Sequence, residues 1–241
     1  MQDHSKPPKA PGVILASSTH TWLPGSKEVR TTQAKLLKWF QVNQRRYPWR
    51  ETRDPYRVLI AEKLLQQTAA RDKLVAAYRE IVSTYPSPAA LASAKRGHLT
   101  RILRPLGLHY RGEELRRLGG ALCIMYRGKV PSELTHLVTL PGVGDYIARA
   151  VRSFAFNIDC PVVDGNVARI LYRLLLLPGT PPPNPARSRK LLLLAGNFIP
   201  RGRSREYNLA LIDLAAAVCT ARQPRCPICP LVSTCDFANT L

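Results

Sequence analysis

The stretch CTARQPRCPICPLVSTC, residues 219–235, holds four of the six cysteines of the chain. They are Cys219, Cys226, Cys229 and Cys235, with six, two and five residues between them. Clustered cysteines in a reducing compartment indicate a metal site rather than disulfides. Four cysteines can hold zinc or an iron–sulfur cluster. Zinc sites usually pair two short knuckles, and only one is present here, so the spacing favours the cluster and leaves zinc as the alternative.

The composition is that of a folded and strongly basic protein. The chain has 241 residues, of which 45% are hydrophobic and 22% charged, so it can form a core. The 36 Lys and Arg outnumber the 16 Asp and Glu, and the net charge is +20. A folded chain with this surplus is expected to bind a polyanion, usually nucleic acid. We expect a cytoplasmic protein, because there is no signal peptide core and no apolar run long enough to span a membrane.

The hydrophobic spacing predicts an all-α fold, since no stretch alternates with the period of two that strands require. Residues 1–30, rich in Pro, Ser, Lys and Gly, are predicted to form a tail, with Thr31 or Thr32 capping the first helix. Asp54-Pro55 marks the start of the next helix, with Asp54 as its cap. The other predicted helices are 72–84, 88–94, 98–104, 111–127, 131–138, 145–156, 166–176, 187–198 and 205–218.

Three further motifs could carry chemistry. In Leu140-Pro141-Gly142-Val143-Gly144, glycine permits a tight turn that would present backbone N–H groups to a phosphate, although most such turns only connect helices. Asp164 precedes a predicted helix, where an Asp is most often an N-cap. Glu62 lies in the apolar run LIAEKLL, residues 59–65, where without further context we would interpret it as a solvated surface residue.

Together these motifs resemble the endonuclease III superfamily of helix–hairpin–helix DNA glycosylases, over residues 31–235. The cysteine spacing resembles the family's cluster loop, LPGVG its hairpin, and VVDGNVARIL the motif of its catalytic Asp. The resemblance implies a six-helix barrel domain at 51–158, containing the helix–hairpin–helix at 131–156. It also implies an iron–sulfur domain formed by 31–50 and 159–241, with a 4Fe–4S cluster as cofactor. The expected partner is double-stranded DNA with a mismatched or damaged base, bound by a monomer.

The resemblance also implies roles for single residues. Asp164 would stabilise the oxocarbenium-like sugar that forms as the N-glycosidic bond breaks. The segment IAEKLLQQT resembles a helix of adenine and thymine glycosylases in which the Glu handles water or protonates the leaving base. Glu62 is therefore assigned acid–base work, and Gln66 with Gln67 the gap left by the flipped nucleotide. The implied DNA contacts are Leu140, Gly142, Val143 and Gly144 in the hairpin and Arg222 and Arg225 in the cysteine loop.

Position 146 bears on the reaction class. Bifunctional members of the family carry a lysine there that attacks the sugar and forms a Schiff base. This chain has Tyr146, so the resemblance implies a monofunctional glycosylase of base excision repair that activates water.

Two substrates fit the resemblance. Compact mismatch glycosylases that remove thymine or uracil opposite guanine end at the cluster and carry Glu, Tyr and Asp at the three catalytic positions, and this is the favoured interpretation. Adenine glycosylases acting opposite guanine or 8-oxoguanine share LQQT, VDGN and the cluster, but normally have a further C-terminal domain. A catalytically silent DNA-binding module and a zinc-ribbon adaptor are the alternatives from other classes.

Overall fold

The computed structural model describes residues 25–66 and 72–241, and every regular element in these ranges is a helix. The all-α prediction is therefore confirmed. The α-helices are α1 (Ser26–Asn43), α2 (Pro55–Leu65), α3 (Asp72–Thr84), α4 (Pro88–Ala92), α5 (Arg96–Leu103), α6 (Arg111–Tyr126), α7 (Leu134–Leu137), α8 (Asp145–Phe154), α9 (Gly165–Leu174), α10 (Arg189–Asn197) and α11 (Ser204–Ala217). None of them is long and apolar enough to cross a bilayer.

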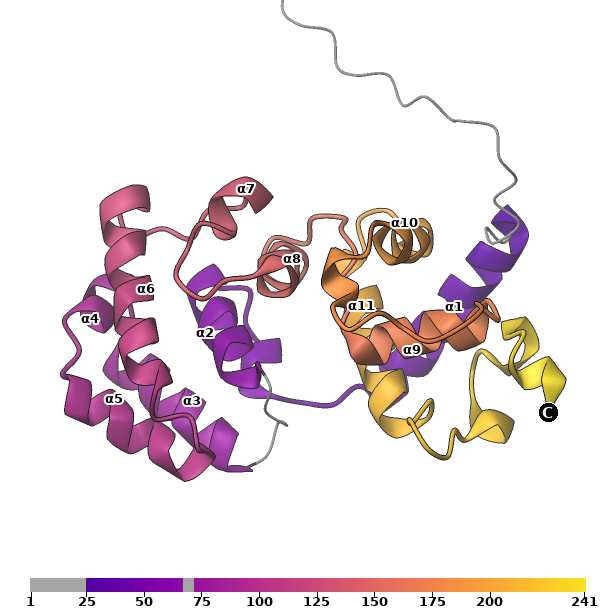
Figure 1. Ribbon diagram of the computed structural model, residues 1–241, viewed down its shortest axis with the longest axis horizontal. Coiled ribbons are helices and arrows are strands. Elements are labelled where there is room, and N and C mark those ends of the chain that lie inside the picture. The colour runs from indigo at the N-terminus through magenta and orange to yellow at the C-terminus, as the bar shows by residue number, and fades with distance from the viewer. Residues whose placement is uncertain (1–24, 67–71) are drawn as a thin grey trace, which may run out of the picture.

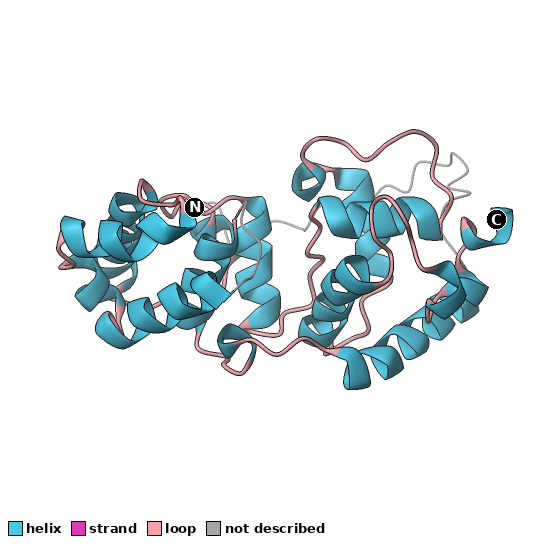
Figure 2. Ribbon diagram, turned by 90° about the horizontal axis from the view of Figure 1, so that it is seen from below, coloured by secondary structure: helices cyan, strands magenta, loops and turns pink. Residues whose placement is uncertain are grey.

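The helices form two lobes (Figure 1). In one lobe α6 packs on α4 and α5, and α2 packs on α3 and α8. In the other, α1 and α9 both pack on α11, and α10 packs on α9. Figure 2 shows the two lobes from below, with loops crossing between them. Because α11 also contacts α8, the buried side chains form one continuous core.

The first helix joins the two ends of the described chain. Helix α1 lies beside the C-terminal segment, where the Thr32 hydroxyl donates to that of Thr234 (3.2 Å). It begins at Ser26, five residues before the predicted start at Thr31, so Thr31 and Thr32 lie inside the helix and do not cap it. The expected tail is thus wrong for residues 26–30, while residues 1–24 lie outside the described part. Glu28 in the first turn favours the earlier start, because a negative charge there interacts well with the helix dipole.

Helix α2 starts where the sequence predicts. Its N-cap Asp54 accepts hydrogen bonds from the N–H groups of Tyr56 (2.8 Å) and Arg57 (3.1 Å), and Pro55 occupies the first turn. The helix is buried on nearly all sides, including the charged residues Glu62 and Lys63. It is therefore an internal helix rather than one with a solvated face.

Candidate active site

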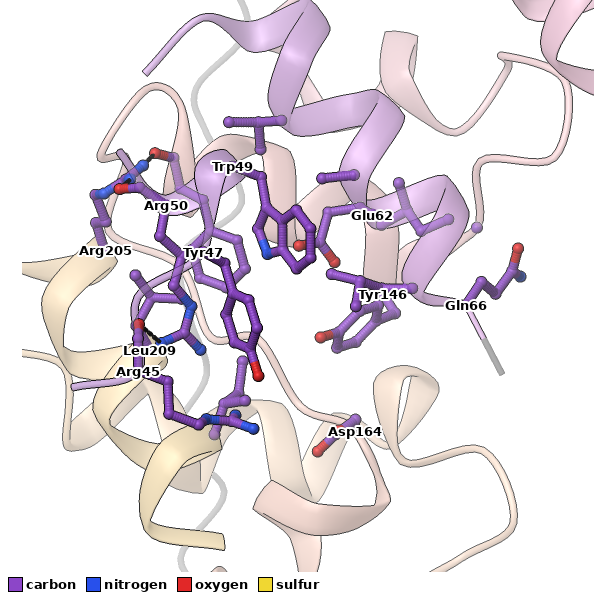
Figure 3. Close-up of a pocket in the computed structure, with 17 residues that line it drawn as sticks. Arg45, Tyr47, Trp49, Arg50, Glu62, Gln66, Tyr146, Asp164, Arg205 and Leu209 are labelled. Carbon is purple, nitrogen blue, oxygen red and sulfur yellow. Dashed lines mark hydrogen bonds between the residues drawn. The ribbon is translucent and has the colours of Figure 1, made fainter. Parts of the chain in front are cut away.

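A cavity of about 400 Å³ between the lobes collects the predicted catalytic residues (Figure 3). Its lining includes Glu62 from α2, Tyr146 from α8 and Asp164 from the start of α9. Gln66, at the end of α2, also lines it. Gln67, predicted to lie beside Gln66, falls outside the described residues. The structure thus brings together residues that the sequence could group only through the resemblance.

The Glu62 carboxyl is buried, with 6% of the residue exposed, so its interpretation as a solvated surface residue is wrong. Burial raises the pKa of Glu62 to about 7, the charge of Arg50 opposes this rise, and the charge of Asp164 adds to it. A carboxyl with a pKa near neutrality can take up or give a proton at physiological pH. This is the property that acid–base work requires.

The Asp164 carboxyl is held by hydrogen-bond donors at the start of α9. One oxygen accepts from the backbone N–H of Val167 (2.8 Å) and the other from the side-chain amide of Asn166 (3.0 Å). These donors and the helix dipole favour a negative charge at this position. The capping role predicted for Asp164 is confirmed, and it leaves the carboxylate at the cavity wall.

A chain of hydrogen bonds connects Asp164 to the cysteine loop. The Asn166 side chain that donates to Asp164 also accepts from the Arg169 guanidinium (3.0 Å). The same guanidinium donates to the backbone carbonyls of Cys219 (3.1 Å) and Ala215 (3.2 Å). The geometry of the carboxylate therefore depends on supports in α11 and at the first cysteine.

Tyr146 lies beside both carboxyls. Its pKa is raised well above its ordinary value, first by burial and then by the charges of Glu62 and Asp164. It is therefore a neutral phenol at physiological pH.

No lysine lines the cavity among the described residues. Lys63 follows Glu62 in the chain, but its ammonium donates to the Glu114 carboxylate (2.8 Å) and the Gly142 carbonyl (2.7 Å).

One wall of the cavity consists of residues that sequence analysis missed. Arg45, Tyr47, Trp49 and Arg50 all line it, immediately before α2. Both arginines are tied to Asp213 of α11: Arg50 donates two hydrogen bonds to it (2.7 and 2.9 Å), and the Arg45 side chain donates a third (2.6 Å). The available signal was RRYPWR, residues 45–50, where three arginines flank a tyrosine and a tryptophan.

Asp213 is fully buried at the centre of this wall. Burial alone would raise the pKa of Asp213, but the hydrogen bonds and charges of Arg50 and Arg45 outweigh it and lower the pKa below its ordinary value. A charged Asp213 thus fixes both guanidinium groups. It connects the 45–50 segment to α11.

The predicted hairpin is a tight turn between α7 and α8. Its first helix is shorter than the predicted 131–138, with only Leu134–Leu137 helical. Gly142 adopts a φ of +67°, which glycine tolerates best. A Cβ there would collide with the Glu114 carboxylate and the Lys63 ammonium, which packs against the turn. The Glu114 and Lys63 side chains would have to shift to admit a Cβ, and the positive φ is the stronger reason for glycine at 142.

The remaining hairpin residues differ in exposure. Gly142 and Gly144 are exposed, and Gly144 is the N-cap of α8 in ordinary extended conformation. The Leu140 and Val143 side chains lie in the core, and the Val143 N–H donates to the Leu140 carbonyl (3.1 Å). Any DNA contact at these two positions would therefore go through the backbone. Gly144 has no side chain to cap the first N–H groups of α8, which leaves them available to an anion.

The comparisons with known proteins decide the family. Residues 60–193 match the HhH-GPD superfamily of base excision DNA repair proteins. The chain is a DNA glycosylase of this superfamily. The relationship to endonuclease III-type glycosylases expected from the motifs is confirmed.

Relatives of two kinds are similar to this glycosylase. It is 36% identical to the thymine-DNA glycosylase of Aeropyrum pernix over 88% of this chain and 96% of the relative. It is also 37% identical to the adenine DNA glycosylase of Mycobacterium tuberculosis, over 83% of this chain and 66% of the relative. Among solved structures, a thermostable thymine-DNA glycosylase superimposes with a TM-score of 0.82 and 28% identity, over 89% of this chain and 98% of that one. The expected helix–hairpin–helix glycosylase fold is confirmed.

The four cysteines of the glycosylase line a second cavity, at the C-terminal end. Burial, together with the charges of the other three cysteines, raises the pKa of Cys229 to about 11, against the lowering effect of a backbone N–H. Bound iron or zinc would stabilise the thiolates that burial disfavours. Among the described residues, no three His, Cys, Asp or Glu side chains are arranged to hold a single metal ion.

The loop between the first two cysteines is fixed by α9. Arg173 donates to the carbonyls of Thr220 (2.7 Å) and Ala221 (2.8 Å) and to the Cys219 sulfur (3.3 Å). Arg222 and Arg225 project from this loop and are exposed. They are therefore placed where a phosphate could reach them.

Proposed function

We propose that this glycosylase hydrolyses thymine or uracil from mispairs with guanine and forms no Schiff base. The observation that carries the proposal is the cavity in which Glu62, Tyr146 and Asp164 meet. It provides one carboxyl that can exchange a proton at neutral pH, one that is oriented by hydrogen bonds from Val167 and Asn166, and no amine among the described lining residues.

The two carboxyls suit a hydrolytic mechanism. As the bond between C1′ and the base nitrogen breaks, its electron pair leaves with the base and the sugar becomes oxocarbenium-like. The Asp164 carboxylate would stabilise this cation electrostatically. The Glu62 carboxylate would take a proton from water as the water oxygen bonds to C1′, and that proton then neutralises the departed base. The products are an abasic site and the free base.

Tyr146, in place of a lysine, bears on whether the enzyme would form a covalent intermediate with DNA. A neutral phenol cannot form an imine with the sugar, so borohydride should trap no covalent adduct with DNA. The reaction should leave abasic sites that break only in hot alkali. A trapped adduct, or strand breaks without alkali, would contradict the monofunctional assignment.

The thymine or uracil substrate is supported by the structural match with a thymine-DNA glycosylase. Adenine removal is the second candidate, because the Mycobacterium relative is similar to a comparable degree and a Glu with a pKa near 7 could also protonate a purine. The test is a panel of duplexes with G·T, G·U, A·8-oxoguanine and A·G pairs, with A·T and A·U as matched controls, each treated with alkali after incubation. Breaks at G·T and G·U alone support the proposal, and breaks at the adenine of A·8-oxoguanine or A·G contradict it.

The four cysteines suit a 4Fe–4S cluster, which would cross-link the C-terminal loop. All four thiols line one cavity, as a cluster with a cysteine on each iron requires. Purified protein should be brown and contain about four irons per chain. A colourless protein loaded with zinc would contradict this assignment.

The two lobes would act as the barrel domain (51–158) and the cluster domain (31–50 and 159–241), with mispaired duplex DNA bound between them. The exposed glycines of the hairpin and Arg222 and Arg225 of the cysteine loop would contact its phosphates. A base would then be flipped into the cavity, with Gln66 entering the gap that it leaves.

A further inference from the structure

Tyr47 stands in a fixed position at the cavity wall. Its ring stacks on that of Trp49, with centroids 4.8 Å apart and planes 5° from parallel. The guanidinium groups of Arg45 and Arg50 lie 5.7 and 5.5 Å from the centre of the same ring. Both are anchored by the buried carboxylate of Asp213. A ring confined in this way gives its hydroxyl a defined place.

The Tyr47 hydroxyl faces the cavity rather than a protein partner. Figure 3 shows it pointing into the space that Tyr146 and Asp164 also face. Within the described ranges it makes no hydrogen bond to another residue. Tyr56 differs, because its hydroxyl donates to the Tyr85 carbonyl (2.7 Å) away from the cavity. The Tyr47 side chain is half-buried, so its hydroxyl, which points into the cavity, is available to donate a hydrogen bond to a bound base.

The chemistry of the departing base supplies that group. When thymine or uracil leaves with the bonding electron pair, negative charge spreads onto its two ring carbonyl oxygens. An O–H donor aimed at such an oxygen stabilises the transition state more than the ground state. In the proposed mechanism Glu62 and Asp164 act as carboxylates, which accept hydrogen bonds and do not donate them. Tyr146 is the other tyrosine of the cavity lining, and the two carboxylates are acceptors that compete for its hydroxyl.

We infer that the Tyr47 hydroxyl donates a hydrogen bond to a ring carbonyl of the flipped pyrimidine and stabilises the base as it leaves. This inference rests on the proposed removal of thymine or uracil. It makes Tyr47 a residue that acts on the leaving group, while Glu62 and Asp164 act on the water and the sugar.

The test is Tyr47→Phe, which keeps the stacked ring and removes only the hydroxyl. Single-turnover rates are measured on duplexes that pair guanine with thymine, uracil or 5-fluorouracil. The variant should remove thymine and uracil about 100-fold more slowly than the parent. The loss should be clearly smaller for 5-fluorouracil, because its electron-withdrawing fluorine already stabilises the leaving anion. A role in packing alone would slow all three bases equally.

Tyr56→Phe is the matched control, since it removes a phenol that lies outside the cavity. It should change the three rates by one common factor. An equal loss on all three bases in Tyr47→Phe, or no loss, overturns the inference while the parent's activity leaves the proposed function standing. A parent that removes none of the three pyrimidines overturns both.

Discussion

In the last turn of α2 a carboxyl is surrounded by the core, whereas at the start of α9 a carboxyl accepts hydrogen bonds from N–H donors. Glu62 does not lie at the start of a helix, and burial raises its pKa to about 7. Asp164 sits where the helix dipole, Val167 and Asn166 all favour its charge. Two side chains of the same chemical type therefore have different surroundings because of their places along helices. The difference suits them to different steps of one reaction.

The largest expected effect comes from removing the charge at the helix start. Asp164→Asn should lower the single-turnover rate about 1,000-fold, because the amide cannot stabilise a cationic sugar. Asn caps helices about as well as Asp, so the melting temperature should stay nearly unchanged. Affinity for mispaired duplex should be kept. Equal rates for variant and parent would remove Asp164 from the mechanism.

Removing the proton acceptor in α2 should have the next largest effect. Glu62→Gln keeps the size of the buried side chain and should slow base removal about 100-fold. Binding of DNA is measured in parallel by fluorescence anisotropy and should not change. Full activity in this variant would show that Glu62 is not needed to activate the water.

The supports of Asp164 provide a sharper comparison. Arg169→Leu breaks the link from Asn166 to the Cys219 carbonyl, so the carboxylate loses its defined orientation and the rate should fall about 10-fold. Arg173→Leu is the matched control, because Arg173 holds the same loop without contacting Asn166. Single-turnover rates at saturating enzyme are compared between the Arg169→Leu and Arg173→Leu variants, and only the first should be slower. If both variants lost the same activity, the loop rather than the link would matter.

The smallest effect is expected outside the cavity. Arg222→Ala and Arg225→Ala should each weaken DNA binding a few-fold and reduce the slope of log affinity against log salt by about 0.9. The single-turnover rate at saturation should not change, because neither residue lines the cavity. Arg116→Ala serves as control, since Arg116 is paired with Glu113 on α6 (3.1 Å). Salt slopes that match the parent's would exclude both arginines as phosphate contacts.

Features with a local signal could be predicted from the sequence. Asp54-Pro55 marked the start of α2, and the bounds of α3 agree with the predicted 72–84. The start of α1 carried no capping side chain, because its N-cap is Gly25, and Glu28 in the first turn was the local signal for it. The outcomes at the starts of α1 and α2 follow from residues within one turn of the helix end.

Features that depend on packing could not be predicted. Glu62 is buried because α3 and α8 enclose α2, and no pattern around residue 62 shows that. The wall that contains Tyr47 depends on Asp213, which lies in α11 in the other half of the chain. The resemblance could supply Glu62, Tyr146 and Asp164 as a set, whereas the residues that surround them required the fold.

The pH dependence of the single-turnover rate tests the central claim most directly, namely that Glu62 accepts the proton of water at neutral pH. Because the basic form is required and burial sets its pKa at about 7, the parent rate should rise about tenfold per pH unit below 7 and level off above it. The residual rate of Glu62→Gln should be flat across the same range. A parent rate that falls as the pH rises through 7 would contradict the account, since it would require the protonated acid that purine removal uses.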